Sequence, residues 1–344
     1  MKKVSVIIPC FNAIKWLPKC FLSLIEQSIG IDSLELIFID DASTDEGQTW
    51  KMLQEFENAF PQSIVIIHLS QNMRQGGARN IGMSYATGKY IAFVDADDFV
   101  RKDFLANVYQ KAVDTDADIV QFGYYVYSEK RGIISKMNNG SIDSIRIESD
   151  QQRKDFLVSE KISYGCWNKL YRRNLVECAS AKYAEHVIYE EPLFVYPLLF
   201  WGNKFEILDE SYYYYRLNDN GTMRKDMMDE KTLLMHADVQ MKVWEYMKNT
   251  SFFNIYYEEI KLYFLHTFFF ETLYFAKQRG FDVSMELYKI LVDVVRKEVP
   301  DYMFSEYKEL IPEQMKLYQL ASKNISEAQL VEYLASLEKL IKKN

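Results

Sequence analysis

Three acidic residues directly follow a short apolar run, and their types and spacing are suited to binding a metal ion. Tyr90 to Val94 predicts a buried strand, because most of its residues are β-branched or aromatic and the run is too short to favour a helix. Asp95, Asp97 and Asp98 stand at its carboxyl end. Close carboxylates repel one another unless a cation lies among them, and hard oxygen ligands beside a phosphate suit Mg²⁺ or Mn²⁺. The alternative is a solvated acidic turn that caps the next helix.

Strands and helices alternate over the first hundred residues. Apolar runs predict the strands, while helical spacing and capping residues predict the helices between them. The predicted strands are Val4–Ile8, which Pro9 ends, Leu34–Ile39, Ile64–Leu69 and Tyr90–Val94, and the predicted helices begin near Ile14, Ser43 and Gly76. This alternation indicates an α/β fold in which a mostly parallel sheet carries helices on both faces.

Polar residues follow three of these strands at the point where each strand ends. They are Pro9–Asn12, Asp40–Asp41 and Asp95–Asp98. Because the carboxyl ends of parallel strands meet at one edge of a sheet, we expect the three segments to form one ligand site. Independent solvated turns are the alternative. A P-loop and a dinucleotide-binding G-x-G-x-x-G motif after the first strand are both absent from the sequence.

Composition and charge exclude several other classes of protein. The chain has 344 residues, 49% hydrophobic and 26% charged, which is typical of a globular protein. A net charge of −8 without a basic cluster argues against a nucleic-acid partner. The four cysteines form no C-x-x-C pair and indicate a reducing compartment. No window reaches the roughly 20 apolar residues that a transmembrane helix needs, so we expect a cytoplasmic protein.

Four motifs in order resemble the family 2 glycosyltransferases with the GT-A fold, of the type that builds bacterial polysaccharides. They are Val6–Asn12, Glu35–Asp45, Asn72–Gly82 and Gly88–Asp98. The resemblance implies a Rossmann-like GT-A domain with a mostly parallel sheet. It also implies an inverting, metal-dependent transfer of a sugar from a UDP-sugar to an acceptor hydroxyl.

The resemblance also implies which residues bind the donor. Pro9 and Phe11 fall in the motif that binds the nucleotide, and Phe11 matches the residue that packs against the base. Asp41 matches the acid that accepts a hydrogen bond from the base, and Arg79 the arginine that contacts the nucleotide. An aromatic face and a carboxylate acceptor suit a flat base with an N–H edge. Plain core packing of Phe11 and a surface ion pair of Arg79 are the alternatives.

The metal ligands implied by the family lie in the acidic segment. Asp97 matches the acid that coordinates the metal and bridges to the diphosphate, and Asp95 the acid near the ribose and the metal. The implied cofactor is Mn²⁺ or Mg²⁺. Some relatives carry a metal-binding histidine after the strand that corresponds to Tyr212–Arg216, but Leu217–Lys225 contains none.

The acceptor side lies later in the chain. A polar loop or hairpin over the site is predicted at 128–150, where Gly132 and Asn138–Gly140 are turn signals. Glu191 matches the family position of the catalytic base, where aspartate is usual, and Glu190 is its competitor. The alternative is that both acids only precede a helix that starts at Pro192. The motif Trp167–Arg172 also resembles the family, and its Lys169 or Arg172 is a candidate for contact with the donor phosphates, with a structural ion pair as the alternative.

The pattern becomes helical from about Met227, and the aromatic-rich segment Phe252–Phe275 predicts either a helical core or a surface at the membrane interface. A capping box of Ser326 with Gln329 starts a last amphipathic helix, whose apolar stripe is Leu330, Leu334, Leu337 and Ile341. That helix docks on its own domain, pairs with a second subunit in a homo-oligomer, or lies on a bilayer in a weak peripheral contact at the inner face of the membrane.

We therefore expect a GT-A domain over 1–225, with a nucleotide-sugar half at 1–125 and an acceptor-side half at 126–225, and a helical region at 226–344. The expected acceptor is a saccharide or a lipid-linked saccharide. Two other functions stay open, a nucleotide-sugar-binding module that has lost catalysis and a nucleotidyltransferase. The second is disfavoured, because no basic phosphate-binding loop follows the first strand.

Overall fold

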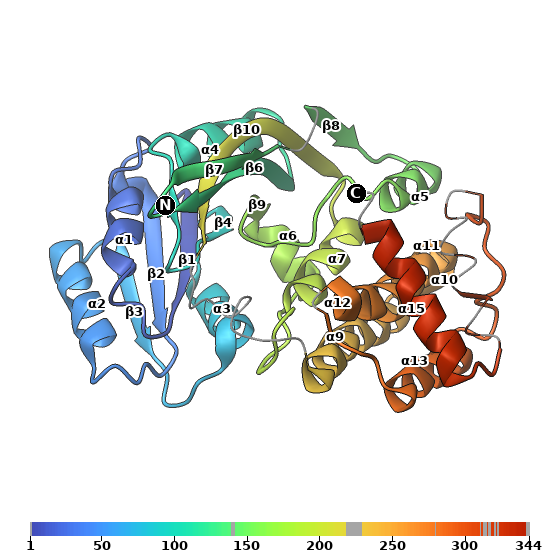
Figure 1. Cartoon of the computed structure of the whole chain (residues 1–344). Coiled ribbons are helices and arrows are strands. Elements are labelled where there is room, and N and C mark those ends of the chain that lie inside the picture. The colour runs from blue at the N-terminus through green and yellow to red at the C-terminus, as the bar shows by residue number, and fades with distance from the viewer. Residues whose placement is uncertain are drawn as a thin grey trace. The chain divides into compact units, whose positions relative to one another are not determined.

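The structure is a computed structural model that describes residues 2–138, 142–217, 229–278, 280–309, 311, 315, 318–319, 321 and 323–341, the last five without their side chains. The chain separates into two compact units, Met1–Gly221 and Thr222–Asn344. The first unit contains the sheet, and the second is helical (Figure 1).

One mixed, mostly parallel sheet organises the first unit (Figure 1). Its strand order is β3 (Ile64–His68), β2 (Leu34–Asp40), β1 (Val4–Cys10), β4 (Tyr90–Phe93), β9 (Lys169–Arg172), β6 (Ile119–Ser128), β10 (Lys204–Arg216) and β5 (Phe99–Val100). β1 to β4 run parallel to one another, as do β6 and β10, whereas β9 is antiparallel to both of its neighbours. This arrangement confirms the predicted fold class.

Helices cover both faces of the sheet because successive strand residues point to opposite sides. The helices of this unit are α1 (Leu17–Ile25), α2 (Gln48–Ala59), α3 (Arg74–Tyr85), α4 (Phe104–Asp114), α5 (Asp150–Val158), α6 (Arg173–Cys178) and α7 (Glu191–Trp201). Val6 of β1 faces a core shared with α1 and α4. Its neighbour Ile7 faces α3, where Gly82 leaves room for the close approach of the helix to the sheet.

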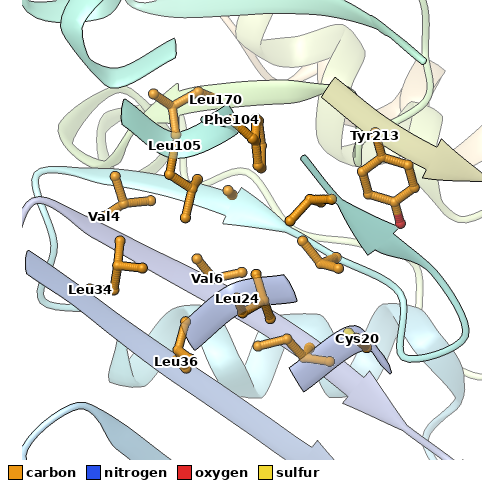
Figure 2. Close-up of a cluster of buried hydrophobic side chains, with 14 of the residues drawn as sticks. Val4, Val6, Cys20, Leu24, Leu34, Leu36, Phe104, Leu105, Leu170 and Tyr213 are labelled. Atoms are coloured by element: carbon orange, nitrogen blue, oxygen red, sulfur yellow. The ribbon is translucent and has the colours of Figure 1, made fainter. Parts of the chain in front are cut away.

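The core on the first of these faces joins elements from the whole unit. Figure 2 shows Val4 and Val6 of β1, Leu34 and Leu36 of β2, and Cys20 and Leu24 of α1 gathered against Phe104 and Leu105 of α4. Leu170 of β9 and Tyr213 of β10 extend the cluster toward the later strands (Figure 2). The first four strands and the later ones therefore share one core.

The prediction that Pro9 ends the first strand is wrong, because β1 continues to Cys10. The carbonyl of Ile7 points toward β4 and accepts a hydrogen bond from Val94 N. Pro9 lies two residues further along the strand, so its backbone nitrogen faces the same side. The pairing of β1 with β4 ends at Ile7 and Phe93. A proline is tolerated there because no ladder carbonyl needs its missing N–H.

The predicted hairpin at 128–150 is confirmed for the described residues. β7 (Gly132–Met137) pairs antiparallel with β6, and β8 (Asp143–Arg146) pairs antiparallel with β10. The Asn139–Gly140 turn signal lies outside the described residues. So does the part of the expected histidine-free loop from 218 to 225.

The second unit consists of helices. They are α9 (Glu230–Lys248), α10 (Phe252–Ile255), α11 (Tyr257–Phe264), the π-helix η2 (Leu265–Glu271), α12 (Thr272–Gln278), α13 (Met285–Glu298) and α15 (Glu327–Ile341). Within Phe252–Phe275 every aromatic side chain is buried or half-buried, with Phe264, Phe268 and Phe269 almost inaccessible. This burial favours the core alternative for the aromatic-rich segment.

The last helix packs within its own unit. Leu330 and Leu334 of its predicted apolar stripe are buried, and α15 contacts α12. The capping box is confirmed, since Gln329 N lies 3.4 Å from Ser326 Oγ and Ser326 N lies 2.9 Å from Gln329 Oε1. The side chains of Leu337 and Ile341 lie outside the described residues. Within the described part of the chain, every helix is too short or too polar to cross a membrane.

Candidate active site

The loops that follow β1 and β2 are joined at the carboxyl edge of the sheet. Asn12 donates from its side chain to Thr44 Oγ1 at 3.1 Å, and its backbone N–H donates to Ser43 Oγ at 2.9 Å. Asp41 N donates to the carbonyl of Cys10 at 2.8 Å. Phe11, between these contacts, is 48% exposed. The plain-core alternative for Phe11 is therefore wrong, and an open aromatic face stands at this edge.

Asp41 lies at the start of α3 rather than in open solvent. It is buried, and its Oδ1 accepts a 2.6 Å hydrogen bond from Met73 N. Burial raises the pKa of Asp41, while hydrogen bonds from the backbone of Met73 and Arg74 act in the opposite direction. Its neighbour Asp40 is also buried and pairs with His68 Nδ1 at 2.8 Å. The carboxylate predicted to meet the base thus also holds the first turn of α3.

Arg79 of α3 joins the end of β4 to the start of α7. Its Nη2 lies 2.7 Å from Asp95 Oδ1, and its Nη1 lies 2.5 Å from Glu190 Oε1. Burial disfavours the charged guanidinium, yet neighbouring acidic groups including Asp95 and Glu190 hold the pKa of Arg79 above its ordinary value. The arginine side chain is only 2% exposed. Arg79 therefore does form ion pairs, as the alternative for this residue expected, but they are buried and join Asp95 to Glu190.

A close approach between α3 and the segment before α7 makes this bridge feasible. A Cβ atom on Gly76 would overlap the carbonyl oxygen of Ala184 and lie 3.0 Å from Glu190 Cγ. Asn80 of the same helix exchanges two hydrogen bonds with the backbone of Tyr183, at 2.8 and 3.0 Å. The glycine and the asparagine of the third motif thus bring Glu190 to Arg79.

Glu190 and Glu191 are adjacent in sequence but meet different partners. Glu190 is buried against Arg79, and burial raises its pKa, with the nearby charge of Glu191 adding to the effect and Arg79 opposing it. Glu191 is half-buried at the first position of α7, and its Oε1 accepts a 2.8 Å hydrogen bond from Cys166 N. No other hydrogen bond to Glu191 occurs among the described residues. Its second oxygen therefore accepts no hydrogen bond from the described residues.

The acids after β4 differ in their surroundings. Asp98 is buried, accepts a hydrogen bond from Tyr213 OH at 2.7 Å and another from Arg216 N at 2.7 Å. Burial raises the pKa of Asp98 well above its usual range, and the charges of Asp97 and Asp95 raise it further. Asp95 and Asp97 are half-buried. Asp98 therefore connects the acidic segment to β10, while the other two acids face less enclosed surroundings.

The acidic segment fits a bound divalent cation, although no group of three or more metal-binding side chains occurs among the described residues. The segment places the half-buried carboxylates of Asp95 and Asp97 beside the buried carboxylate of Asp98. Mg²⁺ in particular is held by one or two carboxylates together with phosphate oxygens and water, so a complete protein cage is unnecessary. Asp97 and Asp95 are the residues that would hold the ion.

Lys169 and Arg172 belong to the same motif but have different surroundings. Lys169 is buried away from solvent, and Arg172 lies away from the carboxyl edge of the sheet. Lys169 is fully buried, and burial lowers its pKa to about 7. Arg172 pairs with Tyr90 at the beginning of β4, which is the opposite edge of the sheet from Asp95, and binds Asp116 and Asp118 there. The predicted contact of Lys169 with donor phosphates stays a prediction.

The contacts of three elements of the site could not be predicted from the sequence. The amide of Cys166 acts through its backbone, which no side-chain pattern reveals. Tyr213 is one of four consecutive tyrosines, and only the pairing of the strands shows which of them reaches Asp98. Asp98 itself is part of the acidic run, but its burial distinguishes it from Asp95 and Asp97 only in the folded chain.

Comparison with known sequences identifies one family model. The model described as "Glycosyl transferase family 2" matches residues 5–179. Glycosyltransferase GlyA of Streptococcus pneumoniae is 30% identical over 51% of this chain, but the match spans only 25% of GlyA. The uncharacterized glycosyltransferase EpsJ of Bacillus subtilis is 29% identical over 66% of this chain and 65% of its own length. The minor teichoic acid biosynthesis protein GgaA of Bacillus subtilis is 30% identical over 62% of this chain and 46% of its own length.

Comparison with solved structures agrees on the fold. TarS of S. aureus, residues 1–349 in complex with UDP-GlcNAc, superposes with a TM-score of 0.72 at 19% identity, covering 99% of this chain and 92% of TarS 1–349. The mannosyltransferase PcManGT of Pyrobaculum calidifontis, in complex with GDP-Man and Mn²⁺, superposes with a TM-score of 0.52 at 16% identity over 93% of this chain and 85% of its own. At these identities the likeness shows a shared fold.

Proposed function

Because the chain belongs to glycosyl transferase family 2, we propose that it is an inverting, metal-dependent glycosyltransferase that moves a sugar from a UDP-sugar to an acceptor hydroxyl. The observation that carries the proposal is the buried bridge from Asp95 through Arg79 to Glu190. It ties the acids of the donor edge to the first turn of α7, where Glu191 presents a free carboxylate oxygen. Metal-binding acids and a base on one scaffold are what this displacement requires.

We propose that the nucleotide binds along the edge formed by β1 and β2. Phe11 offers an exposed aromatic face for the base, and Pro9 and Asp41 flank it from the two strand ends. TarS, whose fold this chain shares, is described in complex with UDP-GlcNAc, which supports a UDP-sugar as the donor. Because both Nη atoms of Arg79 are taken up by acids, its role in this proposal is to hold Asp95 and Glu190 in place.

The departing diphosphate develops negative charge as the bond to the anomeric carbon breaks. A divalent cation held by Asp97 and Asp95 would supply the neutralising charge at that position. PcManGT is described with Mn²⁺, which supports a divalent metal in this fold. The chain's own contribution is the group of three carboxylates that follows β4, those of Asp95, Asp97 and Asp98.

Inversion needs a base on the face of the sugar opposite the diphosphate. We assign this role to Glu191: the acceptor hydroxyl loses its proton to the free oxygen of Glu191 and attacks the anomeric carbon as UDP leaves. The backbone amide of Cys166 orients the carboxylate by holding its other oxygen. Glu190 is less suited to the role, because it is buried and paired with Arg79.

The acceptor is proposed to be a saccharide or a lipid-linked saccharide in the synthesis of a bacterial surface polysaccharide. The teichoic acid biosynthesis protein GgaA among the relatives supports this class. We further propose a cytoplasmic protein with weak membrane contact at most, since a net charge of −8 opposes adhesion to anionic lipid. Salt-sensitive co-sedimentation with anionic vesicles would contradict this part of the proposal.

Hydrolysis of the donor tests the proposal without knowledge of the acceptor. Thermal shift with Mn²⁺ and a panel of nucleotide sugars should reveal the donor, because a ligand that binds only the folded state stabilises it by mass action. UDP release from that donor should then be slow but measurable and should stop in EDTA. Stabilisation by a UDP-sugar without any UDP release, even with saccharide acceptors, would instead favour a binding module that has lost catalysis.

A further inference from the structure

The segment Ser163–Asn168, which leads into β9, is held from the inside by the ammonium group of Lys169. Lys169 Nζ lies 2.9 Å from Ser163 Oγ, 2.5 Å from the carbonyl of Gly165 and 2.8 Å from Asn168 Oδ1. These three acceptors match the three donors of an ammonium group. All of them belong to the segment itself, so the lysine fixes the shape of the loop.

Other contacts fix the same segment at its middle and at its start. Tyr171, two residues along β9 and therefore on the same face as Lys169, donates from its hydroxyl to the carbonyl of Cys166 at 3.1 Å. Gln121 of β6 accepts from Ser163 N at 2.9 Å and donates to the carbonyl of Lys161 at 3.0 Å. The backbone of the segment is thus tied to two neighbouring strands of the sheet.

The segment Ser163–Asn168 contacts residues on both sides of the candidate site, Glu191 on one side and Tyr213 on the other. Cys166 N holds the carboxylate of Glu191. The ring of Trp167, the next residue, packs on Tyr213 with centroids 4.7 Å apart. The hydroxyl of Tyr213 in turn donates to Asp98 and accepts from Asp95 N at 3.1 Å. The segment is therefore linked both to the proposed base and, through Tyr213, to Asp98 and the backbone of Asp95.

We propose that Lys169 is a positioning residue that, through the segment Ser163–Asn168, sets the place of Glu191 relative to Asp95 and Asp98. The inference rests on the proposed function and assigns Lys169 a role other than contact with the donor phosphates. A buried amine is costly in a purely structural position, where an apolar residue of similar size would pack without polar atoms to satisfy. The three hydrogen bonds of Lys169 shape the segment whose Cys166 amide holds Glu191, and this gives the buried side chain a role beyond packing.

Lys169→Met tests the inference, with Lys161→Met as a matched control. Methionine keeps most of the volume but removes all three hydrogen bonds, whereas Lys161 is half-exposed beside the same segment and pairs with Asp143. We expect kcat for UDP release by donor hydrolysis to fall on the order of 10- to 100-fold in Lys169→Met, because small misplacements of a catalytic group have effects of this size. In Lys169→Met, the donor KM and the affinity for UDP with Mn²⁺ should stay within about twofold of wild type. In Lys161→Met, kcat should also stay within about twofold of wild type.

The pH profile separates positioning from a loss of folded protein. A carboxylate that loses an aligned N–H donor takes up a proton at higher pH, so the acidic limb of the kcat profile should move upward in Lys169→Met. A drop in the amount of folded enzyme would lower kcat at every pH without moving that limb. Unchanged kcat, or a loss confined to KM and UDP affinity, would overturn the inference, and the second result would favour contact with the donor phosphates.

Tyr171→Phe provides a second variant if Lys169→Met fails to fold. It removes only the hydroxyl that holds the Cys166 carbonyl, and we expect a decrease of kcat of a few fold and a smaller shift of the same limb. Wild-type values in Tyr171→Phe would then overturn the inference. Absence of UDP release from the wild-type protein with every donor would contradict the proposed function itself, which distinguishes the two failures.

Discussion

Arg79 Nη1 lies 2.5 Å from Glu190 Oε1, although the two residues are 111 positions apart in the sequence. Both side chains are buried, and the same guanidinium also binds Asp95. This pairing fixes one of two adjacent glutamates in a structural contact and leaves the next one, Glu191, at the start of α7 with an oxygen free of hydrogen bonds from the described residues. The division of roles between the two acids can be tested directly.

Glu191→Gln should lose sugar transfer while donor binding survives, because it keeps the shape of the side chain and removes the basic oxygen. The expected loss is on the order of 10² or more in single-turnover rate. Glu190→Gln should instead destabilise the fold by about 3–5 kcal/mol, since it removes one partner of a buried ion pair. Single-turnover kinetics and urea denaturation of both variants, with Glu177→Gln on the exposed face of α6 as control, check this division. Near wild-type transfer by Glu191→Gln would mean that the base lies elsewhere.

Asp97→Asn should keep the fold but abolish metal-dependent UDP binding and turnover, because it removes a charged oxygen ligand. Calorimetric titration of UDP with and without Mn²⁺ measures the effect. Asp114→Asn on the exposed end of α4 serves as a control with the same loss of charge. Full activity of Asp97→Asn, or of the wild type in excess EDTA, would be incompatible with the metal assignment.

Asp41→Ala should weaken the affinity for UDP, because the base loses a carboxylate acceptor. It should also lower the free energy of unfolding by roughly 1–3 kcal/mol, since Met73 N loses a buried hydrogen-bond partner. Comparison of UDP with a nucleotide of a different base separates the two effects, because a purely structural loss would weaken both ligands equally. Unchanged UDP affinity would remove Asp41 from the donor site.

Gly76→Ala should disrupt the site from a position that touches no substrate. The added methyl group would overlap the carbonyl of Ala184 and press on Glu190, so the segment before α7 must move away from α3. We expect a destabilisation of about 1–3 kcal/mol and a loss of turnover larger than the loss of donor affinity. Ser84→Ala, on the exposed surface of the same helix, should leave both quantities unchanged. A fully active Gly76→Ala protein would show that this close approach is dispensable.

The burial of Lys169 predicts a particular dependence of stability on pH. Burial lowers its pKa from 10.5 to about 7 in the folded protein, opposed by the charge of Glu191. Between pH 7 and 10.5 the unfolded chain therefore binds more protons at this residue, and its contribution to stability rises with pH through that window. The change should be on the order of a few kcal/mol. Denaturation curves from pH 6 to 10 should show a flatter pH dependence in Lys169→Met than in wild type, and parallel curves would contradict the lowered pKa.

The sequence predicted the first four strands of the sheet because each is a short apolar run, and it predicted the helices between them from helical spacing and capping residues. The order of the four motifs identified the family before any contact was known. The acidic segment at the end of β4 and the polar ends of β1 and β2 followed from the rule that parallel strands finish at one edge. The boundaries were less accurate, as at Pro9, because a strand's end depends on which neighbour still pairs with it.

Only the tertiary structure shows which partner each of the two adjacent glutamates contacts. Glu190 and Glu191 have the same side chain and adjacent positions, so no sequence pattern distinguishes the one that meets Arg79 from the one that meets the Cys166 amide. Lys169 was equally ambiguous, because a lysine's sequence position does not show whether its ammonium points to solvent or into a loop. Sequence encodes periodicity and local preference, but the partner of a buried charge is set by which distant segments pack together, and that depends on the whole fold.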